Sequence, residues 1–506
     1  ALTEARSEET PITETTYGKL RGSREQGIYV FRGIPYGADT SGKNRFMPPQ
    51  KPASWSGIRD ALGWGQCAPQ PLASANYDYT RAVCWAKLRG GTGEDCLVLN
   101  VWTPALKDGG KRAVLFSIHG GGYTSGTSSN PVFDGGNLAR RNNVVVVTVN
   151  HRLGALGFLH LGEFAPEFAQ SGVVGLMDLV AALQWVRNNI ENFGGDPGRV
   201  LIFGQSGGGS KVCHLMAMPS AKGLFQRAAV ESGPSLRSGT PEKATESAER
   251  LLRQLALPKT RFQELQDAPY EIIIGAQGAC GARFGPYVDG EVVPRDPFDP
   301  NAPDISADVP LLAGSNLHDN NLGRTDFSID DAAAQEQLKT VLGADTARVW
   351  TAYRQADPKA TAAQLWARIS SDHGIRAATR TLIERKTELG RAPGYLYLLK
   401  WPAPFMGGRY GAVHGTDVPL IFHNPEVWPL TAGSRESGLL ADHMSAAFVA
   451  FAKSGAPGTP DLPWRAYDSS SKPTMIFNVQ SGIQNDPDHD LLALLPAGGG
   501  VRGMGI

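Results

Sequence analysis

The feature that most constrains the fold is a serine set among glycines, G-Q-S-G-G at residues 204–208. A short apolar segment, 199–204, precedes it with a strand pattern, and a helical segment begins near Gly209. So sharp a strand-to-helix turn forces the serine into a strained backbone conformation, and only glycine leaves room for the adjoining chain. The serine then lies at a helix N-terminus, where the helix dipole favours negative charge. The pattern predicts a nucleophilic Ser206 on a strand–turn–helix unit.

Strand and helix signals alternate around this turn. Residues 113–118 and 143–150 are apolar runs, as expected of strands that are covered on both faces of a sheet. Residues 173–190 carry apolar side chains at helical spacing. A strand–helix–strand succession is typical of a parallel sheet with right-handed crossovers. We therefore expect an α/β fold.

The chain contains no linker rich in Ser, Pro and Gly and no internal repeat, so we expect a single domain over residues 1–506. Two stretches of helical periodicity indicate helical insertions that form the pocket, at about 234–310 and 323–410. The glycine-rich end, about 496–506, predicts a flexible tail.

The charges of the chain balance: Lys and Arg together number 49, and Asp and Glu also number 49. This balance gives no charged field of the kind that binds nucleic acid or an anionic membrane. No apolar run approaches the ~20 residues that cross a bilayer. We expect a protein without a membrane span whose partner is a small molecule, and the sequence carries no signal of an oligomeric state.

A second glycine cluster, H-G-G-G at residues 119–122, directly follows the strand expected at 113–118. Consecutive glycines let backbone N–H groups converge on one point, as stabilising a tetrahedral oxyanion requires. We assign the N–H groups of Gly121, Gly122 and Gly207 to an oxyanion hole. A phosphate cradle is the alternative, but the cluster lacks the Lys-Ser/Thr ending of a P-loop and the spacing of a dinucleotide fingerprint.

Several further motifs occur in a fixed order along the chain. They are F-R-G-I-P-Y at 31–36, E-D-C-L at 94–97, N-H-R-L-G at 150–154 and N-F-G-G-D-P at 192–197. Together with the serine turn, they resemble the type-B carboxylesterase family, which includes cholinesterases and bacterial para-nitrobenzyl esterases. The resemblance covers about residues 15–480. It implies the α/β-hydrolase fold and a serine-dependent carboxylic ester hydrolase.

The resemblance also indicates a catalytic histidine. His414 lies in G-A-V-H-G-T-D at 411–417, which resembles the catalytic-histidine loop of the family, and we expect it to be the general base. Other histidines near candidate motifs are expected to be structural: His119, His214 and His318.

The acid of the triad departs from the commonest family pattern. The segment G-S-N-L-H-D-N at 314–320 resembles a post-strand turn that usually ends in Asp-Glu-Gly, and Asp319 occupies the position of that Glu. A carboxylate here would accept the histidine Nδ1–H and stabilise the imidazolium. The alternative is that Asp319 caps a turn and that Asp417 or Glu231 supplies the carboxylate. Ser232 resembles a supporting serine that hydrogen-bonds the triad.

Other matching positions are expected to be structural. Arg45 with Glu94, and Arg152 with Asp178, correspond to family ion pairs that fix loops. Trp85 lies about where cholinesterases have a cation-binding tryptophan, but simple packing is the better interpretation and choline specificity is not supported.

The implied reaction is acyl transfer through an acyl-enzyme, without a metal or organic cofactor. Two rival functions use the same scaffold: a non-catalytic cholinesterase-like binding protein, and an amidase or transacylase with the same triad. The intact set of nucleophile, base and carboxylate argues against the first.

The substrate class is less constrained. Arg81, Lys87 and Arg89 could favour an ester that bears carboxylates, although a solvated charged face is the simpler interpretation. The chain also resembles the bacterial fumonisin esterases, which remove tricarballylate arms.

The five cysteines give an indication of the cellular compartment, because disulfides form in oxidising compartments. Cys67 and Cys96 could form one disulfide that closes a loop of about thirty residues, which would favour a secreted or periplasmic protein. The alternative is a cytoplasmic enzyme in which all five are buried thiols, including Cys84, Cys213 and Cys280. No CxxC pair or His/Cys cluster supports a metal site. The chain opens on Ala rather than Met, so we expect that a leader was removed or the start was trimmed.

Overall fold

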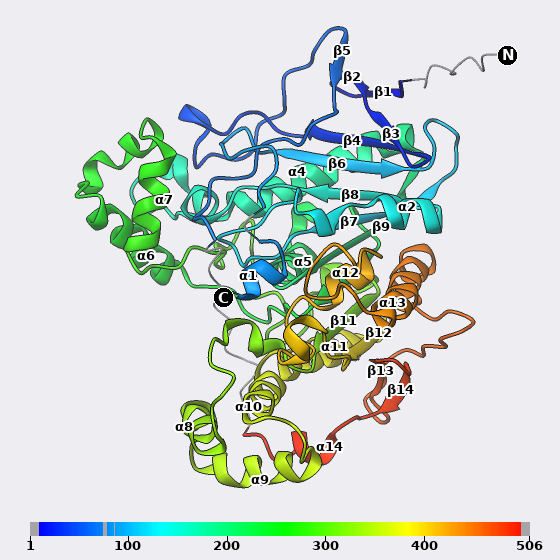
Figure 1. Ribbon diagram of the computed structural model, residues 1–506. Helices are drawn as coiled ribbons and strands as arrows, with labels where there is room; N and C mark the ends of the chain where they lie inside the picture. The colour runs from blue at the N-terminus through cyan, green and yellow to red at the C-terminus, as the bar shows by residue number, and fades with distance from the viewer. Residues whose placement is uncertain (1–9, 74–77, 86, 497–506) are drawn as a thin grey trace, which may run out of the picture.

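The computed structural model describes residues 10–73, 78–85 and 87–496, and it contains one large mixed sheet with helices on both faces (Figure 1). The strands are β1 (Ile12–Thr15), β2 (Gly18–Arg21), β3 (Ser23–Glu25), β4 (Ile28–Pro35), β5 (Ile58–Asp60), β6 (Val98–Thr103), β7 (Arg112–Ile118), β8 (Val145–Val149), β9 (Gly195–Gln205), β10 (Arg227–Glu231), β11 (Leu311–Asn316), β12 (Gly394–Leu399), β13 (Pro473–Phe477) and β14 (Gly482–Asn485).

The α-helices are α1 (Asp78–Ala82), α2 (Gly136–Asn142), α3 (Gly154–Phe158), α4 (Val174–Asn189), α5 (Gly207–Ala217), α6 (Pro241–Gln254), α7 (Tyr270–Ala279), α8 (Asp331–Leu342), α9 (Thr346–Ala356), α10 (Ala362–Ser371), α11 (Ala377–Glu388), α12 (Asp417–Ile421), α13 (Arg435–Ser454) and α14 (His489–Leu492). Short 3-10 segments join several of them, including η7 (Lys259–Gln266) and η9 (Asp319–Gly323), and a π-helical turn, η11 (Asp372–Arg376), links α10 to α11.

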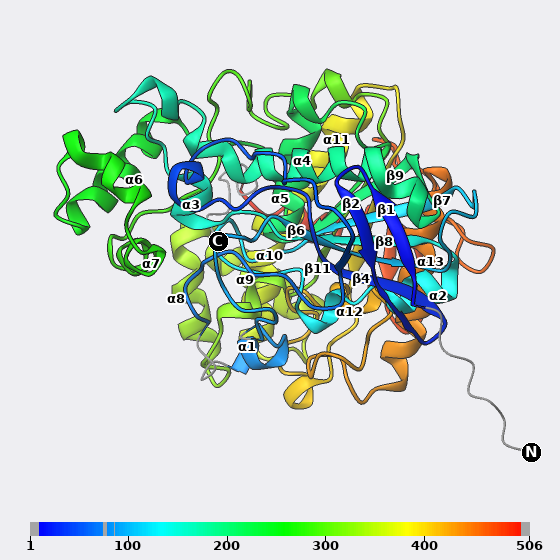
Figure 2. The same cartoon turned by 90° about the horizontal axis from the view of Figure 1, so that it is seen from above.

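The strand order of the large sheet is β14-β13-β12-β11-β10-β9-β7-β8-β6-β4-β3. The central strands, from β13 to β8 in this order, pair in parallel, and the antiparallel pairs lie towards the two edges. The expected α/β fold is therefore confirmed. A small sheet of β1, β2 and β5 lies beside the β3–β4 edge (Figures 1 and 2).

Successive side chains of β7 point to opposite faces of the sheet, and both faces are covered by helices. Val114 and Phe116 belong to a buried cluster that contains residues of α4, α5 and α11. Ala113 and Leu115 point to the other face and belong to a cluster with residues of α2, α12 and α13. Because both faces are packed, β7 and β8 are apolar along nearly their whole length, as the sequence predicts.

The predicted elements are present, with shifted ends. The helix expected at 173–190 is α4, and the helix expected near Gly209 begins directly after Ser206 as α5. The strand expected at 199–204 is longer, since β9 begins at Gly195.

The two segments expected as insertions differ in content. Residues 234–310 carry α6, η7 and α7, which project to one side of the sheet (Figure 1). Residues 323–410 carry α8, α9 and α10, which form their own small core, but also α11 and the sheet strand β12. Nearly all of the predicted tail, at 497–506, lies outside the described residues.

One helical stretch, Pro166–Phe193, is long and apolar enough by composition to cross a membrane. It includes α4, and 72% of its most apolar window is buried inside the protein. Most of its buried apolar side chains belong to the core cluster that also contains Val114 and Phe116 of β7.

The expected disulfide between Cys67 and Cys96 is wrong, because both cysteines are free and fully buried. The Cys67 thiol lies 3.0 Å from Oγ1 of Thr127 and 3.5 Å from Oγ of Ser129, so it faces a group of hydroxyls. Cys96 belongs instead to the apolar core, where burial raises the pKa of its thiol. The other cysteines are also free: Cys84, Cys213 and Cys280. The expectation of a secreted location relied on this bridge and stays a prediction.

Candidate active site

Ser206 occupies a strained turn between β9 and α5. Its backbone angles are φ 59° and ψ −125°, outside the regions that ordinary residues favour. A Cβ added at Gly208 would lie 2.1 Å from the carbonyl oxygen of Ile118, so a side chain there would collide with backbone. Ser206 N–H donates to the carbonyl of Glu231 at 2.7 Å, which fastens the turn to the neighbouring strand.

The glycine loop at 119–122 lies directly against this turn. Gly121 and Gly122 have φ values of 87° and 60°, in the left-handed region that glycine adopts without penalty. A Cβ added at Gly207 would lie 2.5 Å from the backbone nitrogen of Gly122, so these two backbones are in contact. A Cβ added at Gly120 would lie 3.4 Å from Cβ of Ser206. The proposed oxyanion donors are thus gathered beside the serine.

Asp319 and His414 meet although they belong to different loops. Asp319 opens η9 just after β11, and its Oδ1 lies 2.8 Å from Nδ1 of His414. Its Oδ2 accepts the Oγ–H of Ser232 at 3.0 Å and the N–H of Asn316 at 2.9 Å. The Nε2 atom of His414 is buried and has no hydrogen-bond partner among the described residues. This nitrogen is the one that a catalytic base presents to its nucleophile.

The backbone of residues 231–233 connects the serine turn to this pair. Glu231 accepts the N–H of Ser206, and a Cβ added at Gly233 would lie 1.9 Å from the carbonyl oxygen of Ser206. Ser232, between them, hydrogen-bonds Asp319 as the sequence suggests. Residues 231–233 therefore contact both Ser206 and Asp319.

The two alternative acids have other surroundings. Asp417 is fully buried and accepts hydrogen bonds from Tyr397 Oη at 2.8 Å and Asn316 Nδ2 at 3.3 Å. Burial, with the nearby Asp319 charge, raises the pKa of Asp417 to about 6. Burial and the Asp417 charge also raise the pKa of Glu231 well above its usual value. The carboxylate that contacts His414 is Asp319.

The remaining histidines of the motifs are held by structural contacts. His119 bonds the carbonyl of Gly120 and stacks on His151, with ring centroids 4.9 Å apart. His214 bonds Ser210 on its own helix. His318 accepts the N–H of Ala412 and so ties the acid turn to the histidine loop. Burial lowers the pKa of His119 and of His318 to about 3, which keeps both rings neutral.

The expected ion pairs are confirmed. Arg152 and Asp178 form a bidentate pair at 2.6 and 2.9 Å, and both side chains are buried. Arg45 pairs with Glu94 and is also buried. Both pairs hold loops to the core.

Aromatic side chains border the site. Tyr79, on α1, donates its hydroxyl to the carbonyl oxygen of His414 at 2.6 Å. Trp85 is half-buried, and its indole lies so close to Gly121 that an added Cβ would be 2.7 Å from Cζ2. The expectation that Trp85 packs is confirmed. Tyr79 belongs to no motif that would have marked it in the sequence, and Asn316 lies in the quoted segment 314–320, from which only Asp319 was assigned a role.

A group of charged residues adjoins Tyr79. Arg81, which is 61% exposed, and Arg409, which is 36% exposed, both pair with Asp78. Lys87 and Arg89 are exposed further along the same segment.

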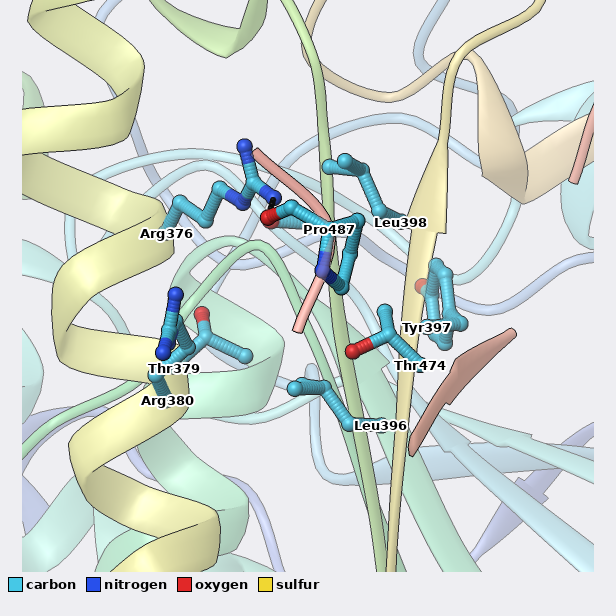
Figure 3. Close-up of a pocket in the computed structure, with 9 residues that line it drawn as sticks. Arg376, Thr379, Arg380, Leu396, Tyr397, Leu398, Thr474 and Pro487 are labelled. Atoms are coloured by element: carbon cyan, nitrogen blue, oxygen red, sulfur yellow. Dashed lines mark hydrogen bonds between the residues drawn. The ribbon is translucent and has the colours of Figure 1, made fainter. Parts of the chain in front are cut away.

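A separate small pocket lies between α11 and the strands β11, β12 and β13 (Figure 3). Tyr397 lines it together with Arg376 and Arg380. Both arginines are already paired with carboxylates of the segment before α14. Among residues 10–73, 78–85 and 87–496, no group of three His, Cys, Asp or Glu side chains has an arrangement that could hold a metal ion.

Comparisons with known proteins agree with the motifs. The model of the carboxylesterase family matches residues 9–491. The para-nitrobenzyl esterase of Bacillus subtilis (strain 168) is 33% identical over 498 residues, covering 95% of this chain and 97% of that protein. The fumonisin B1 esterase of Sphingopyxis macrogoltabida is 31% identical over 494 residues, covering 93% of this chain and 87% of that protein.

Among solved structures, a carboxylesterase of Geobacillus stearothermophilus at pH 6.2 has a TM-score of 0.82 and 34% identity, covering 96% of this chain and 100% of that one. The chain therefore belongs to the carboxylesterase family and is a carboxylic ester hydrolase of the α/β-hydrolase fold.

Proposed function

We propose that the enzyme hydrolyses small-molecule esters through an acyl-enzyme, with Ser206 as nucleophile, His414 as general base and Asp319 as the acid. The observation that carries the proposal is the contact of 2.8 Å between Asp319 and His414 Nδ1, which leaves the buried Nε2 without a partner. Nothing else in the described site competes for that nitrogen.

The first half-reaction is acylation. His414 Nε2 takes the proton of Ser206 as Oγ attacks the ester carbonyl carbon, and the carbonyl oxygen becomes an oxyanion. The backbone N–H groups of Gly121, Gly122 and Gly207 stabilise that charge. When the C–O bond breaks, His414 returns the proton to the leaving alkoxide, and an alcohol departs.

The second half-reaction is hydrolysis of the acyl-enzyme. His414 takes a proton from water, the hydroxide adds to the acyl carbonyl, and Ser206 leaves with the proton that His414 returns. Asp319 holds the imidazole in the required tautomer and stabilises the imidazolium in both steps. Ser232 and Asn316 fix the orientation of Asp319.

The test is Ser206→Ala, assayed with p-nitrophenyl acetate beside the wild type. We expect hydrolysis to fall to the buffer rate while circular dichroism and thermal unfolding stay unchanged. Wild-type turnover in the folded variant would overturn the proposal. Initial rates on an ester and its matched amide separate an esterase from an amidase, and we expect the ester to react at least a thousandfold faster.

A finer proposal concerns the charge of the substrate. Arg81 and Arg409 share the single carboxylate of Asp78 next to Tyr79, which leaves positive charge beside the site. The 31% identity to a fumonisin B1 esterase also supports a preference for a negatively charged substrate. We propose that esters bearing free carboxylates, of the tricarballylate type, are preferred.

The substrate test compares a tricarballylate monoester with its neutral dimethyl derivative. We expect a higher kcat/KM for the charged ester, an advantage that shrinks at high salt and in Arg409→Gln. Equal values for both esters at low salt would contradict the preference.

A further inference from the structure

Lys211 is a fully buried lysine whose ammonium the mechanism above does not use. Its Nζ donates to the carbonyl oxygen of Gly122 at 2.8 Å and to that of His119 at 3.3 Å. These two residues are the first and last of the H-G-G-G loop. Lys211 therefore bridges both ends of the segment that carries two of the proposed oxyanion donors.

The position of Lys211 on α5 strengthens this relationship. Gly207 begins α5, and Lys211 follows four residues later, so both lie on one face of the helix. The backbone of Gly207 contacts that of Gly122, and Lys211 bonds the carbonyl of the same glycine. The helix that begins after Ser206 thus holds the glycine loop at two points.

The glycine loop at 119–122 keeps a fixed geometry only if other groups hold it in place. Consecutive glycines have the greatest backbone freedom of any sequence, so three of them fix a geometry only where other groups hold them. The residue after the loop is held to α5 as well, since Tyr123 Oη lies 2.5 Å from Ser210 Oγ. Burial lowers the pKa of Lys211 to about 7, but a neutral amine keeps two N–H donors, and both carbonyl bonds persist in either form.

We infer that Lys211 is a positioning residue of the oxyanion hole: it locks residues 119–122 to α5 and so fixes the donors on the glycine loop relative to the donor of Gly207. This inference rests on the proposed function. It predicts a defect in stabilising the tetrahedral state, not in binding the ester, because the substrate is not in contact with a buried Nζ.

The chain offers a matched control. Lys386, on α11, is also buried, and its Nζ donates to two backbone carbonyls, those of Ser306 and Ala307, at 3.0 and 2.7 Å. Lys386→Met removes the same kind of bridge from a part of the protein outside the proposed site. Its effect measures what the loss of any such lysine does to folding.

The experiment compares Lys211→Met with Lys386→Met on three readouts: kcat and KM for p-nitrophenyl acetate, inhibition by an alkyl trifluoromethyl ketone, and inhibition by the matching methyl ketone. The trifluoromethyl ketone forms a tetrahedral adduct with the serine and reports on the oxyanion hole, whereas the methyl ketone reports on ground-state binding. For Lys211→Met we expect kcat to fall at least tenfold, KM to change less than threefold, and the trifluoromethyl ketone to bind at least tenfold more weakly. Methyl ketone binding should stay within twofold, and Lys386→Met should leave all three readouts within twofold.

The inference is overturned if folded Lys211→Met keeps kcat and trifluoromethyl ketone binding within twofold of the wild type, or if both ketones weaken equally. If Lys211→Met does not fold, Lys211→Gln, whose amide keeps N–H donors, gives the same comparison with smaller expected losses. Ser206→Ala, assayed in parallel, separates the two claims. An active Ser206→Ala enzyme overturns the proposed mechanism, whereas an inactive one beside an unaffected Lys211→Met enzyme overturns only the role of Lys211.

Discussion

The carboxylate of Asp319 lies 2.8 Å from Nδ1 of His414, although the two residues are 95 positions apart in the sequence. The same carboxylate accepts bonds from Ser232 and from the backbone of Asn316, so both of its oxygens are occupied. The short side chain of Asp319 therefore reaches the histidine directly.

The first prediction concerns this acid. Asp319→Asn keeps the size of the side chain but offers the histidine the wrong tautomer, so kcat should fall by about 10⁴-fold. Steady-state kinetics on p-nitrophenyl acetate measure the loss. Activity within tenfold of the wild type would show that another carboxylate, Asp417 or Glu231, supplies the charge.

The second prediction concerns the support of Asp319. Ser232→Ala removes the hydroxyl that donates to Oδ2 of Asp319. A hydrogen bond to a charged group contributes about 1.5–3 kcal/mol, so kcat should fall by about tenfold or more with KM little changed. An unchanged kcat in the folded variant would mean that the backbone N–H of Asn316 suffices.

Local patterns could be predicted from the sequence because their physical causes are local. Glycine is required at position 208 because an added Cβ would collide with the carbonyl oxygen of Ile118. The strands β7 and β8 are apolar because they are buried on both faces of the sheet. The motifs also identified His414 and Asp319 before their contact was visible. Their proximity, however, depends on how two distant loops pack.

Other features depend on tertiary packing and could not be predicted from local sequence patterns. Spacing allowed a disulfide between Cys67 and Cys96, but the thiol of Cys67 faces Thr127 while Cys96 lies in the apolar core. Lys211 has no motif of its own, and its role emerges only from its distance to the glycine loop. The sheet strand β12 lies within a segment of mainly helical periodicity.

The third prediction concerns the serine turn. A Cβ at Gly208 would lie 2.1 Å from the carbonyl oxygen of Ile118, so Gly208→Ala should destabilise the protein by about 2 kcal/mol or more. Gly275→Ala is the matched control, because Gly275 lies in α7 and has nothing within 4 Å of an added Cβ. It should stabilise the protein by about 0.5–1 kcal/mol. Urea unfolding measures both, and equal effects would contradict the packing around Ile118.

The fourth prediction concerns pH. The pKa of Asp417 is raised to about 6, so the folded protein holds this proton more tightly than the unfolded chain. Stability from this group is present at low pH and is lost as pH rises from about 4 through 6. Asp417→Asn does not titrate, so it should gain up to about 3 kcal/mol relative to the wild type between pH 4 and pH 7.5. A difference that is constant with pH would contradict the raised pKa.

The fifth prediction concerns the cysteines. Because Cys67 and Cys96 are free thiols, dithiothreitol should leave the thermal midpoint unchanged. Alkylation under denaturing, non-reducing conditions should modify both. A disulfide-linked peptide that joins them in the mass spectrum would contradict the structure.

In the proposed mechanism, an ester transfers its acyl group to Ser206. Rapid acid quenching during turnover of p-nitrophenyl acetate, followed by peptide mass spectrometry, detects this acyl group on the protein. We expect one acetyl group per chain, on the peptide that contains residues 204–208, and none in Ser206→Ala. Turnover without an adduct, or an adduct at another residue, would contradict it.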